Sequence, residues 1–253
     1  MTTYGRVLED NVALVYGSGP IGGAIARGFA LAGARVFLAG RTGGTLERAA
    51  GEIREAGGVV ETALVDALDE HSVDRFVDQV AETAGSVDIT CNVIGYGDVH
   101  QPLTEISVDD FLRPILNATR SHFLTARAAV RHMIPQRAGV ILAFGGTSPK
   151  AIPGLGGFTV ALDAVESLRR QWAVELGQYG IRVVTLRTGG IPDSIPDDFD
   201  GKDVITESIV GDTLLGRAAT VEDVGTVAAF VASDLARTMT CTEVNISCGA
   251  IPE

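Results

Sequence analysis

Short apolar runs alternate along this chain with longer segments in which apolar residues recur every three or four positions. The short runs predict buried β-strands over 12–16, 35–39, 59–65, 88–93, 139–144, 182–186 and 243–246. The longer segments predict helices over 21–32, 45–56, 72–84, 109–133, 158–179 and 221–233. This alternation is typical of βαβ units, and it predicts a doubly wound α/β fold in which helices cover both faces of a parallel sheet.

One long region departs from this pattern. Residues 188–210 are rich in glycine, proline and aspartate and show little periodicity, so the sequence predicts a long loop after the sixth strand. Loops of this length are usually functional or mobile. In doubly wound sheets ligands bind beyond the carboxyl ends of the strands, so the residues that follow each strand are the first candidates for a site.

Length and composition favour one soluble domain. The 253 residues, 46% of them hydrophobic, suffice for a single α/β domain over 1–253. No apolar run approaches the roughly 18 residues that suggest a membrane span, so we expect no membrane partner. The first residues show neither a basic region followed by an apolar stretch nor a lipidation signal, and we expect a cytoplasmic location.

The net charge of the chain excludes some classes of partner. The formal net charge is −12, whereas nucleic acids and anionic membranes bind basic surfaces. We therefore expect a small-molecule substrate and no nucleic acid. The three cysteines, Cys91, Cys241 and Cys248, lie in apolar contexts without metal-ligand spacing, which predicts buried thiols, no disulfide and no metal site.

A glycine-rich motif directly follows the first predicted strand and opens a helix: Gly17, Ser18, Gly19, Pro20, Ile21 and Gly22. In such a motif the glycines allow a tight turn, close approach of a pyrophosphate and close helix–strand packing, and the helix N-terminus favours the phosphates. The motif predicts that all of these residues except the proline contribute to dinucleotide binding. The alternative is a structural turn in a site that no longer binds a cofactor.

The end of the second predicted strand bears on which dinucleotide is bound. A carboxylate there would bind the adenosine ribose of NAD and repel a 2′-phosphate, but the chain has Arg41 followed by Thr42. An arginine can pair with the 2′-phosphate through charge-assisted hydrogen bonds. The sequence therefore favours NADP(H) over NAD(H). A merely solvated arginine, and with it the absence of any cofactor, remains the alternative.

Further segments carry a family resemblance. Asp66 follows the third predicted strand, 91–95 reads Cys-Asn-Val-Ile-Gly, 215–224 reads Leu-Gly-Arg-Ala-Ala-Thr-Val-Glu-Asp-Val, and 229–234 reads Ala-Phe-Val-Ala-Ser-Asp. From about 11 to 249 the chain resembles the short-chain dehydrogenase/reductase family. The resemblance implies a Rossmann-type sheet of about seven strands and assembly as a dimer or tetramer. It also assigns Asp66, Asn92, Gly95 and Ile191 to cofactor binding.

The same resemblance exposes departures at the family's catalytic positions. The family's mechanism uses a tyrosine as proton donor, a lysine four residues later, a serine and an asparagine. Alignment on the fifth strand and the flanking helices places Gly146 at the serine, Phe158 at the tyrosine, Leu162 at the lysine and Ala118 at the asparagine. Phenylalanine has no exchangeable proton. The two lysines of the chain do not follow a tyrosine by four residues, so no shift of register restores the pair.

Other groups near the expected site are weaker catalytic candidates. They are Tyr96, Asp98 and His100 after the fourth strand, Ser148 and Lys150 after the fifth, and Asp193 after the sixth. Asn117 lies one residue before the asparagine position but faces roughly 100° around the helix. Tyr96 has a phenol that could donate a proton, and the alternative is a tyrosine that lines the pocket. For the others, solvated loop residues and surface charges are the alternative.

Three functions stay open at this point. The protein is a non-standard enzyme that performs an isomerisation, elimination or cyclisation in the inherited cleft, with NADP(H) or substrate bound. Alternatively, it is a catalytically silent subunit in a hetero-oligomer with an active relative. In the third hypothesis the protein is an NADPH-dependent carbonyl reductase with a relocated proton donor such as Tyr96.

Overall fold

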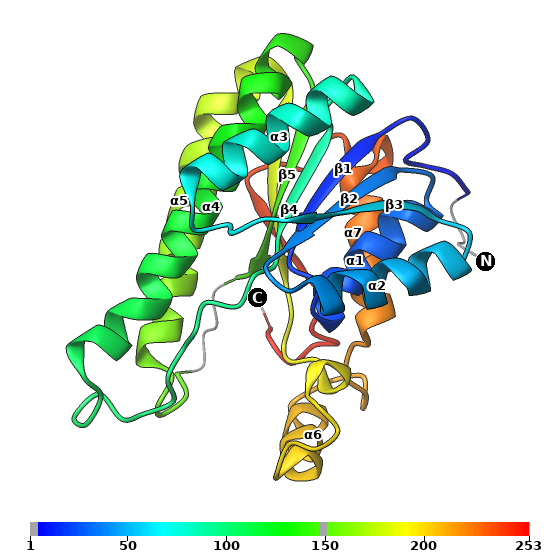
Figure 1. The fold of residues 1–253 in the computed structure, drawn as a ribbon. Coiled ribbons are helices and arrows are strands. Elements are labelled where there is room, and N and C mark those ends of the chain that lie inside the picture. Colours follow the sequence, from blue (N-terminus) through cyan, green and yellow to red (C-terminus); the bar gives the residue numbers. More distant parts are fainter. Residues whose placement is uncertain (1–4, 147–150, 253) are drawn as a thin grey trace.

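A single parallel sheet forms the centre of the molecule (Figure 1). The computed structural model describes residues 5–146 and 151–252. The strands are β1 (Val12–Tyr16), β2 (Arg35–Gly40), β3 (Val59–Leu64), β4 (Ile89–Asn92), β5 (Gly139–Gly145), β6 (Ile181–Arg187) and β7 (Thr242–Asn245). Their order across the sheet is β3-β2-β1-β4-β5-β6-β7. All five residues of β1 are buried, because helices cover both of its faces.

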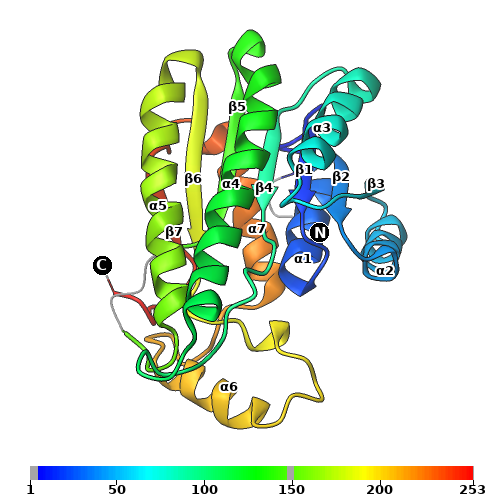
Figure 2. The ribbon, with the colours of Figure 1, turned by 60° about the vertical axis from the view of Figure 1, so that its left-hand side comes forward.

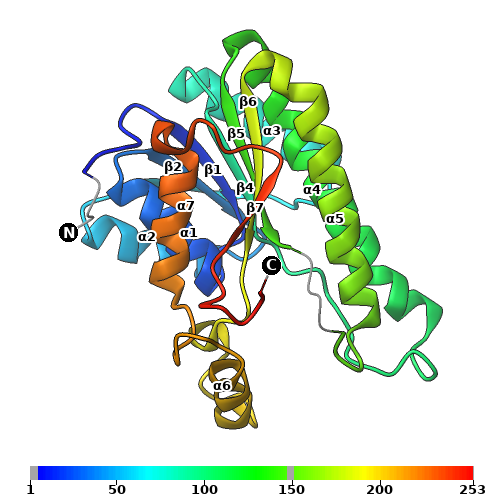
Figure 3. The ribbon, with the colours of Figure 1, turned by 180° about the vertical axis from the view of Figure 1, so that it is seen from behind.

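Helices pack on both faces of this sheet, which confirms the predicted Rossmann-type, doubly wound fold (Figures 1 and 3). One layer consists of α1 (Pro20–Leu31), α2 (Gly43–Glu55) and α7 (Val221–Ala232). The opposite layer consists of α3 (Glu70–Ala84), α4 (Val108–Gln136) and α5 (Gly156–Leu176). The chain therefore forms three layers, with one apolar core on each side of the sheet.

The first layer depends on small residues where α1 crosses α7. A Cβ atom added to Gly28 would lie 2.4 Å from the carbonyl oxygen of Gly225, and one added to Gly225 would lie 2.4 Å from that of Ala24. The two backbones therefore touch, and no larger residue fits at this crossing. This contact fixes the position of α1, whose N-terminus forms part of the site described below.

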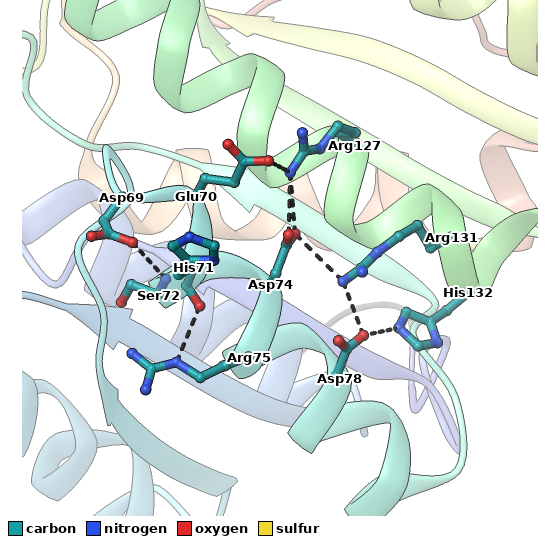
Figure 4. Close-up of polar contacts among 10 residues, drawn as sticks. All are labelled: Asp69, Glu70, His71, Ser72, Asp74, Arg75, Asp78, Arg127, Arg131 and His132. Atoms are coloured by element: carbon teal, nitrogen blue, oxygen red, sulfur yellow. Dashed lines mark hydrogen bonds and ion pairs between the residues drawn. The ribbon is translucent and has the colours of Figure 1, made fainter.

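Ion pairs join α3 to α4 on the opposite layer (Figure 4). The acidic residues of α3 face basic residues of α4: Arg127 contacts Glu70 at 2.8 Å and Asp74 at 3.2 Å, Arg131 contacts Asp78 at 2.9 Å, and His132 contacts Asp78 at 2.9 Å. Pairs this exposed each contribute only about 0.2–1 kcal/mol. Together they favour one register of α3 against α4, the helix that bears the position aligned with the family's asparagine.

The structure corrects two expectations. The region 188–210, predicted as a loop, contains a 3₁₀ turn (Pro192–Ser194) and the start of a helix, α6 (Lys202–Gly211), beyond the carboxyl end of β6 (Figure 2). None of the residues of α6 is buried, so packing against the core does not impose on it the apolar stripe from which the other helices were predicted. Cys91 is buried as predicted, but Cys248 is half-buried and Cys241 is exposed.

In the described part of the chain, no helix combines the length and the apolar character that a membrane span requires.

Candidate functional site

A cavity of about 310 Å³ opens at the carboxyl ends of β1, β2, β3 and β4. Six of the residues predicted to bind a cofactor line it together: Gly17, Ser18, Gly19, Arg41, Asp66 and Gly95. These residues come from four different strand ends and lie up to 78 positions apart in the sequence. The location is the one at which doubly wound sheets bind their ligands.

The glycine-rich turn forms the floor of this cavity. Gly17 has a φ of +111°, and a Cβ atom there would lie 2.8 Å from the carbonyl oxygen of Val93. A Cβ atom at Gly22 would lie 1.9 Å from the carbonyl oxygen of Gly17, so the helix packs directly on the turn. Gly19 precedes α1, and a Cβ atom there would meet nothing within 4 Å. The helix N-terminus therefore meets an open space suited to phosphates.

Arg41 lies at the lip of the cavity, where its side chain is exposed. No hydrogen bond or ion pair joins its guanidinium to another described residue, so the group is available to an anion. Ser18 and Thr45 stand beside it, with their hydroxyl oxygens 2.8 Å apart. The carboxylate of Asp66 accepts a hydrogen bond from the Leu68 amide at 3.0 Å, which fixes its orientation at the cavity wall.

Four predicted cofactor residues do not line the cavity. Gly22 acts through the close packing just described, and Ile21 packs against the core. Ile191 is buried in the same core cluster. Asn92 is buried beneath the wall, where its side-chain oxygen accepts a hydrogen bond from the Ile94 amide at 3.1 Å. In this structure these residues support the site from behind, and direct contact with a cofactor stays a prediction.

Asn117 lines the cavity, although alignment gives its neighbour Ala118 the asparagine position. Its side-chain nitrogen donates a hydrogen bond to the Tyr96 carbonyl at 2.8 Å. Ala118 is fully buried on another face of α4. One residue along a helix changes direction by about 100°, so the geometry, and not the alignment, identifies the polar residue at this wall.

The remaining catalytic positions of the family are occupied by a packed apolar cluster. Buried members of this cluster are Tyr96, Ala118, Ala143, Ala161, Leu162 and Val165, and Phe158 and Ile115 pack against it. Leu162 reaches over the end of β5, where its Cδ2 atom would lie 2.6 Å from a Cβ atom at Gly145. Neither Phe158 nor Leu162 can hold or move a proton, so these two positions of α5 have no acid–base capacity.

The serine position is filled by a neighbouring side chain. Gly146 has a φ of +78°, and a Cβ atom there would lie 2.7 Å from the Cβ, Cγ and Cδ atoms of Arg187. The guanidinium of Arg187 pairs with the carboxylate of Glu243 at 3.0 Å. The aliphatic part of Arg187 therefore occupies the space that a serine side chain would need.

The hydroxyl of Tyr96 points away from the cavity. It lies 2.9 Å from Nε2 of His122 and 3.3 Å from the Phe144 carbonyl oxygen, and the residue is only 6% exposed. Burial raises the pKa of this phenol well above its usual range. Tyr96 therefore packs inside the apolar cluster, and its geometry does not favour the relocated proton donor.

The structure brings only two of the other described catalytic candidates together. Nε2 of His100 lies 2.6 Å from a carboxylate oxygen of Asp98, in the loop that continues from the cavity wall. Asp193 is exposed, and Ser148 and Lys150 lie outside the described residues. No group of histidine, cysteine and acidic side chains suited to a metal occurs in the described ranges 5–146 and 151–252.

Comparison with known proteins gives matches along nearly the whole chain. A family model described as enoyl-(acyl carrier protein) reductase matches residues 17–250. Secoisolariciresinol dehydrogenase of Forsythia intermedia is 32% identical over 252 residues, which cover 94% of this chain and 87% of that protein. L-rhamnose 1-dehydrogenase (NAD(P)(+)) of Azotobacter vinelandii is 31% identical over 250 residues, with 92% and 94% covered. The crystal structure of NAD⁺-bound xylitol dehydrogenase has a TM-score of 0.87 at 25% identity, covering 96% of this chain and 99% of that one.

Proposed function

Because this chain belongs to the short-chain dehydrogenase/reductase family, we propose that it binds NADP(H) without performing the family's tyrosine-dependent hydride transfer. One observation carries this proposal: the nucleotide cavity is formed, whereas Phe158 and Leu162 contribute to a packed apolar cluster where the proton donor and its lysine would stand. The relatives named above are dehydrogenases, so the proposal separates this chain from them in chemistry and not in fold.

The proposed cofactor contacts follow from the cavity. The N-terminus of α1 and the turn before it would hold the pyrophosphate, and Asp66, which lines the cavity, would contact the adenine. The solved xylitol dehydrogenase binds NAD⁺, and the name of the rhamnose dehydrogenase includes both cofactors. The preference for NADP(H) therefore rests on Arg41, since no carboxylate ends β2.

The proposed chemistry needs no proton relay through α5. Loss of a positioned acid–base group typically costs about 10²- to 10⁴-fold in rate, so ordinary carbonyl reduction would be very slow. Isomerisation, elimination or cyclisation of a small molecule requires an acid–base group at the cleft, but no redox change. The Asp98–His100 pair is our candidate for this group, because it directly follows Gly97 of the cavity wall along the chain.

Replacing Arg41 tests the cofactor choice. We expect Arg41→Ala to weaken NADPH binding by about 10- to 100-fold, the equivalent of one or two charge-assisted hydrogen bonds, and to leave NADH binding unchanged. Calorimetric titration of both nucleotides measures the effect. Arg48→Ala is the matched control, because Arg48 is an exposed arginine on α2 that does not line this cavity. Equal weakening of NADPH and NADH binding, or an unchanged affinity for NADPH, would contradict the assignment.

A second candidate function is a silent subunit paired with an active relative. The observation that favours it is a set of exposed apolar side chains on α4 and α5: Leu116, Phe123, Val160 and Val174. Apolar surface of this kind marks protein–protein contact sites. The face is separate from the nucleotide cavity, so it would persist after catalysis is lost.

We expect this α4–α5 face to assemble the chain, either with itself or with a relative of the same family. Light scattering at micromolar concentration should show a dimer or tetramer, and Leu116→Glu with Val174→Glu should dissociate it. Leu64→Glu is the control, because Leu64 is equally exposed but lies on β3 at the far edge of the sheet. A stable monomer, combined with a pull-down from native extract that contains no family relative, would refute both forms of assembly.

A further inference from the structure

We propose that Tyr96 and His122 form a buried polar link that holds the wall of the nucleotide cavity in place, so that both act as positioning residues for the nucleotide. This inference rests on the proposed function, because it assigns a role within the same site. It replaces the catalytic role that the phenol of Tyr96 suggests from sequence alone.

The place of Tyr96 in the wall is the first step. The wall between β4 and α4 includes Val93, Ile94, Gly95 and Gly97, all of which line the cavity. Tyr96 stands between the last two but turns the other way, into the apolar cluster. Its ring lies 6.1 Å from that of Phe158. The segment is therefore anchored from behind by one side chain, while its neighbours face the nucleotide.

The hydrogen bonds of Tyr96 tie this wall to two other elements. A phenol has one proton, so both of its contacts are satisfied when His122 Nε2–H donates to the phenol oxygen and the phenol donates to the Phe144 carbonyl. His122 belongs to α4 and Phe144 to β5. Asn117 of α4 adds a third tie, through its bond to the Tyr96 carbonyl. The geometry thus predicts the Nε2–H tautomer of His122.

Electrostatics keep this link neutral. Burial lowers the pKa of His122 to about 4. Burial, followed by the charge of Glu166, raises the pKa of Tyr96 well above its usual range. Near neutral pH neither group carries charge, so the link itself buries no charge inside the cluster. A neutral link in apolar surroundings stabilises one arrangement of the wall, since breaking it would leave buried polar atoms unpaired.

Two variants separate positioning from stability. Tyr96→Phe keeps the ring but removes the phenol oxygen, so it should lower the melting temperature and weaken NADPH binding by about 3- to 10-fold. The double variant Tyr96→Phe with His122→Leu also removes the unpaired imidazole. It should regain part of the lost thermal stability, because no buried imidazole is left unpaired and only the Phe144 carbonyl oxygen still lacks the phenol donor, yet keep the weakened NADPH binding. Tyr179→Phe is the control for both measurements, because Tyr179 is a half-buried tyrosine that follows α5.

Two further measurements keep this test distinct from the proposed function. Nitrogen-15 NMR of His122 should show the Nε2–H tautomer in the native chain. Amide hydrogen exchange of Ile94, Gly95 and Gly97 should accelerate in both variants without any nucleotide present. If the native chain binds no NADPH, the proposed function fails. The tautomer of His122 and the exchange rates of the wall still test whether the Tyr96–His122 link holds the wall in place. An Nδ1–H tautomer, unchanged exchange at the wall, or native NADPH affinity in the double variant would overturn the positioning role.

Discussion

Gly22→Ala is expected to destabilise the fold by about 3 kcal/mol and to abolish NADPH binding. The new Cβ atom would lie 1.9 Å from the carbonyl oxygen of Gly17 and 2.8 Å from its carbonyl carbon. Both are backbone atoms of the turn, so no flexible side chain can move aside. Relief requires α1 to shift away from β1, but α1 is held on its other side by the contact of Gly28 with Gly225. The turn would therefore lose its shape.

The neighbouring glycine provides a matched control. A Cβ atom at Gly23 would meet only the Cβ atom of Ala49, at 3.6 Å, which is ordinary contact. Gly23→Ala is expected to be neutral or to stabilise α1 by up to about 1 kcal/mol, because alanine favours a helix over glycine. Urea unfolding and NADPH titration of both variants measure the difference. Similar stability of the two variants would show that the close approach of α1 to the turn is not required.

Restoring the family's catalytic residues is expected to fail. Gly146→Ser places a side chain where Arg187 already lies, at a backbone φ of +78° that non-glycine residues rarely adopt. Leu162→Lys places an ammonium group among the buried residues Ala143, Ala161 and Val165, where loss of hydration opposes its charge. The triple variant with Phe158→Tyr should therefore be destabilised by several kcal/mol, on the order of 3 or more, before any activity is gained.

Gly146→Ser alone identifies the main obstacle. This variant should lower the free energy of unfolding, measured in urea, by about 2 kcal/mol or more. The strained backbone at position 146 and the overlap with Arg187 both oppose the serine side chain. Gly211→Ser is the control, since a Cβ atom at Gly211 meets nothing within 4 Å. A folded triple variant with native stability and measurable ketone reduction would mean that the catalytic centre is less altered than the packing indicates.

The strands and most helices were predictable from the sequence for a physical reason. Parallel strands covered on both faces are continuous apolar runs, and β1 was predicted with its observed limits for this reason. The helices that cover the sheet have an apolar stripe, so α3 and α7 were predicted within two residues of their observed ends. By contrast, α6 buries no residue, and nothing in its periodicity distinguishes it from a loop.

The site was predictable where a local motif or the end of a strand defines it. The turn that contains Gly17 and Gly22 needs glycine for reasons that act within a few residues, so its spacing indicates its role. The positions of Arg187 and His122 depend on which strand end or helix face meets another element. Arg187 fills the serine position from β6, and the pattern around His122 indicates only a helix. Side-chain contacts across elements decide these roles, and one sequence does not encode them locally.

The central claim is that the isolated chain binds NADPH but does not use it to reduce carbonyl compounds by the family's mechanism. The most direct measurement is NADPH titration of the pure protein, followed by NADPH oxidation with a panel of ketones and 3-oxoacyl compounds at saturating cofactor. We predict saturable binding together with oxidation slower than about 0.1 per second, given typical enzyme rates of about 1–10³ per second and the loss of the acid–base group. Sustained oxidation at 1 per second or faster would contradict the account.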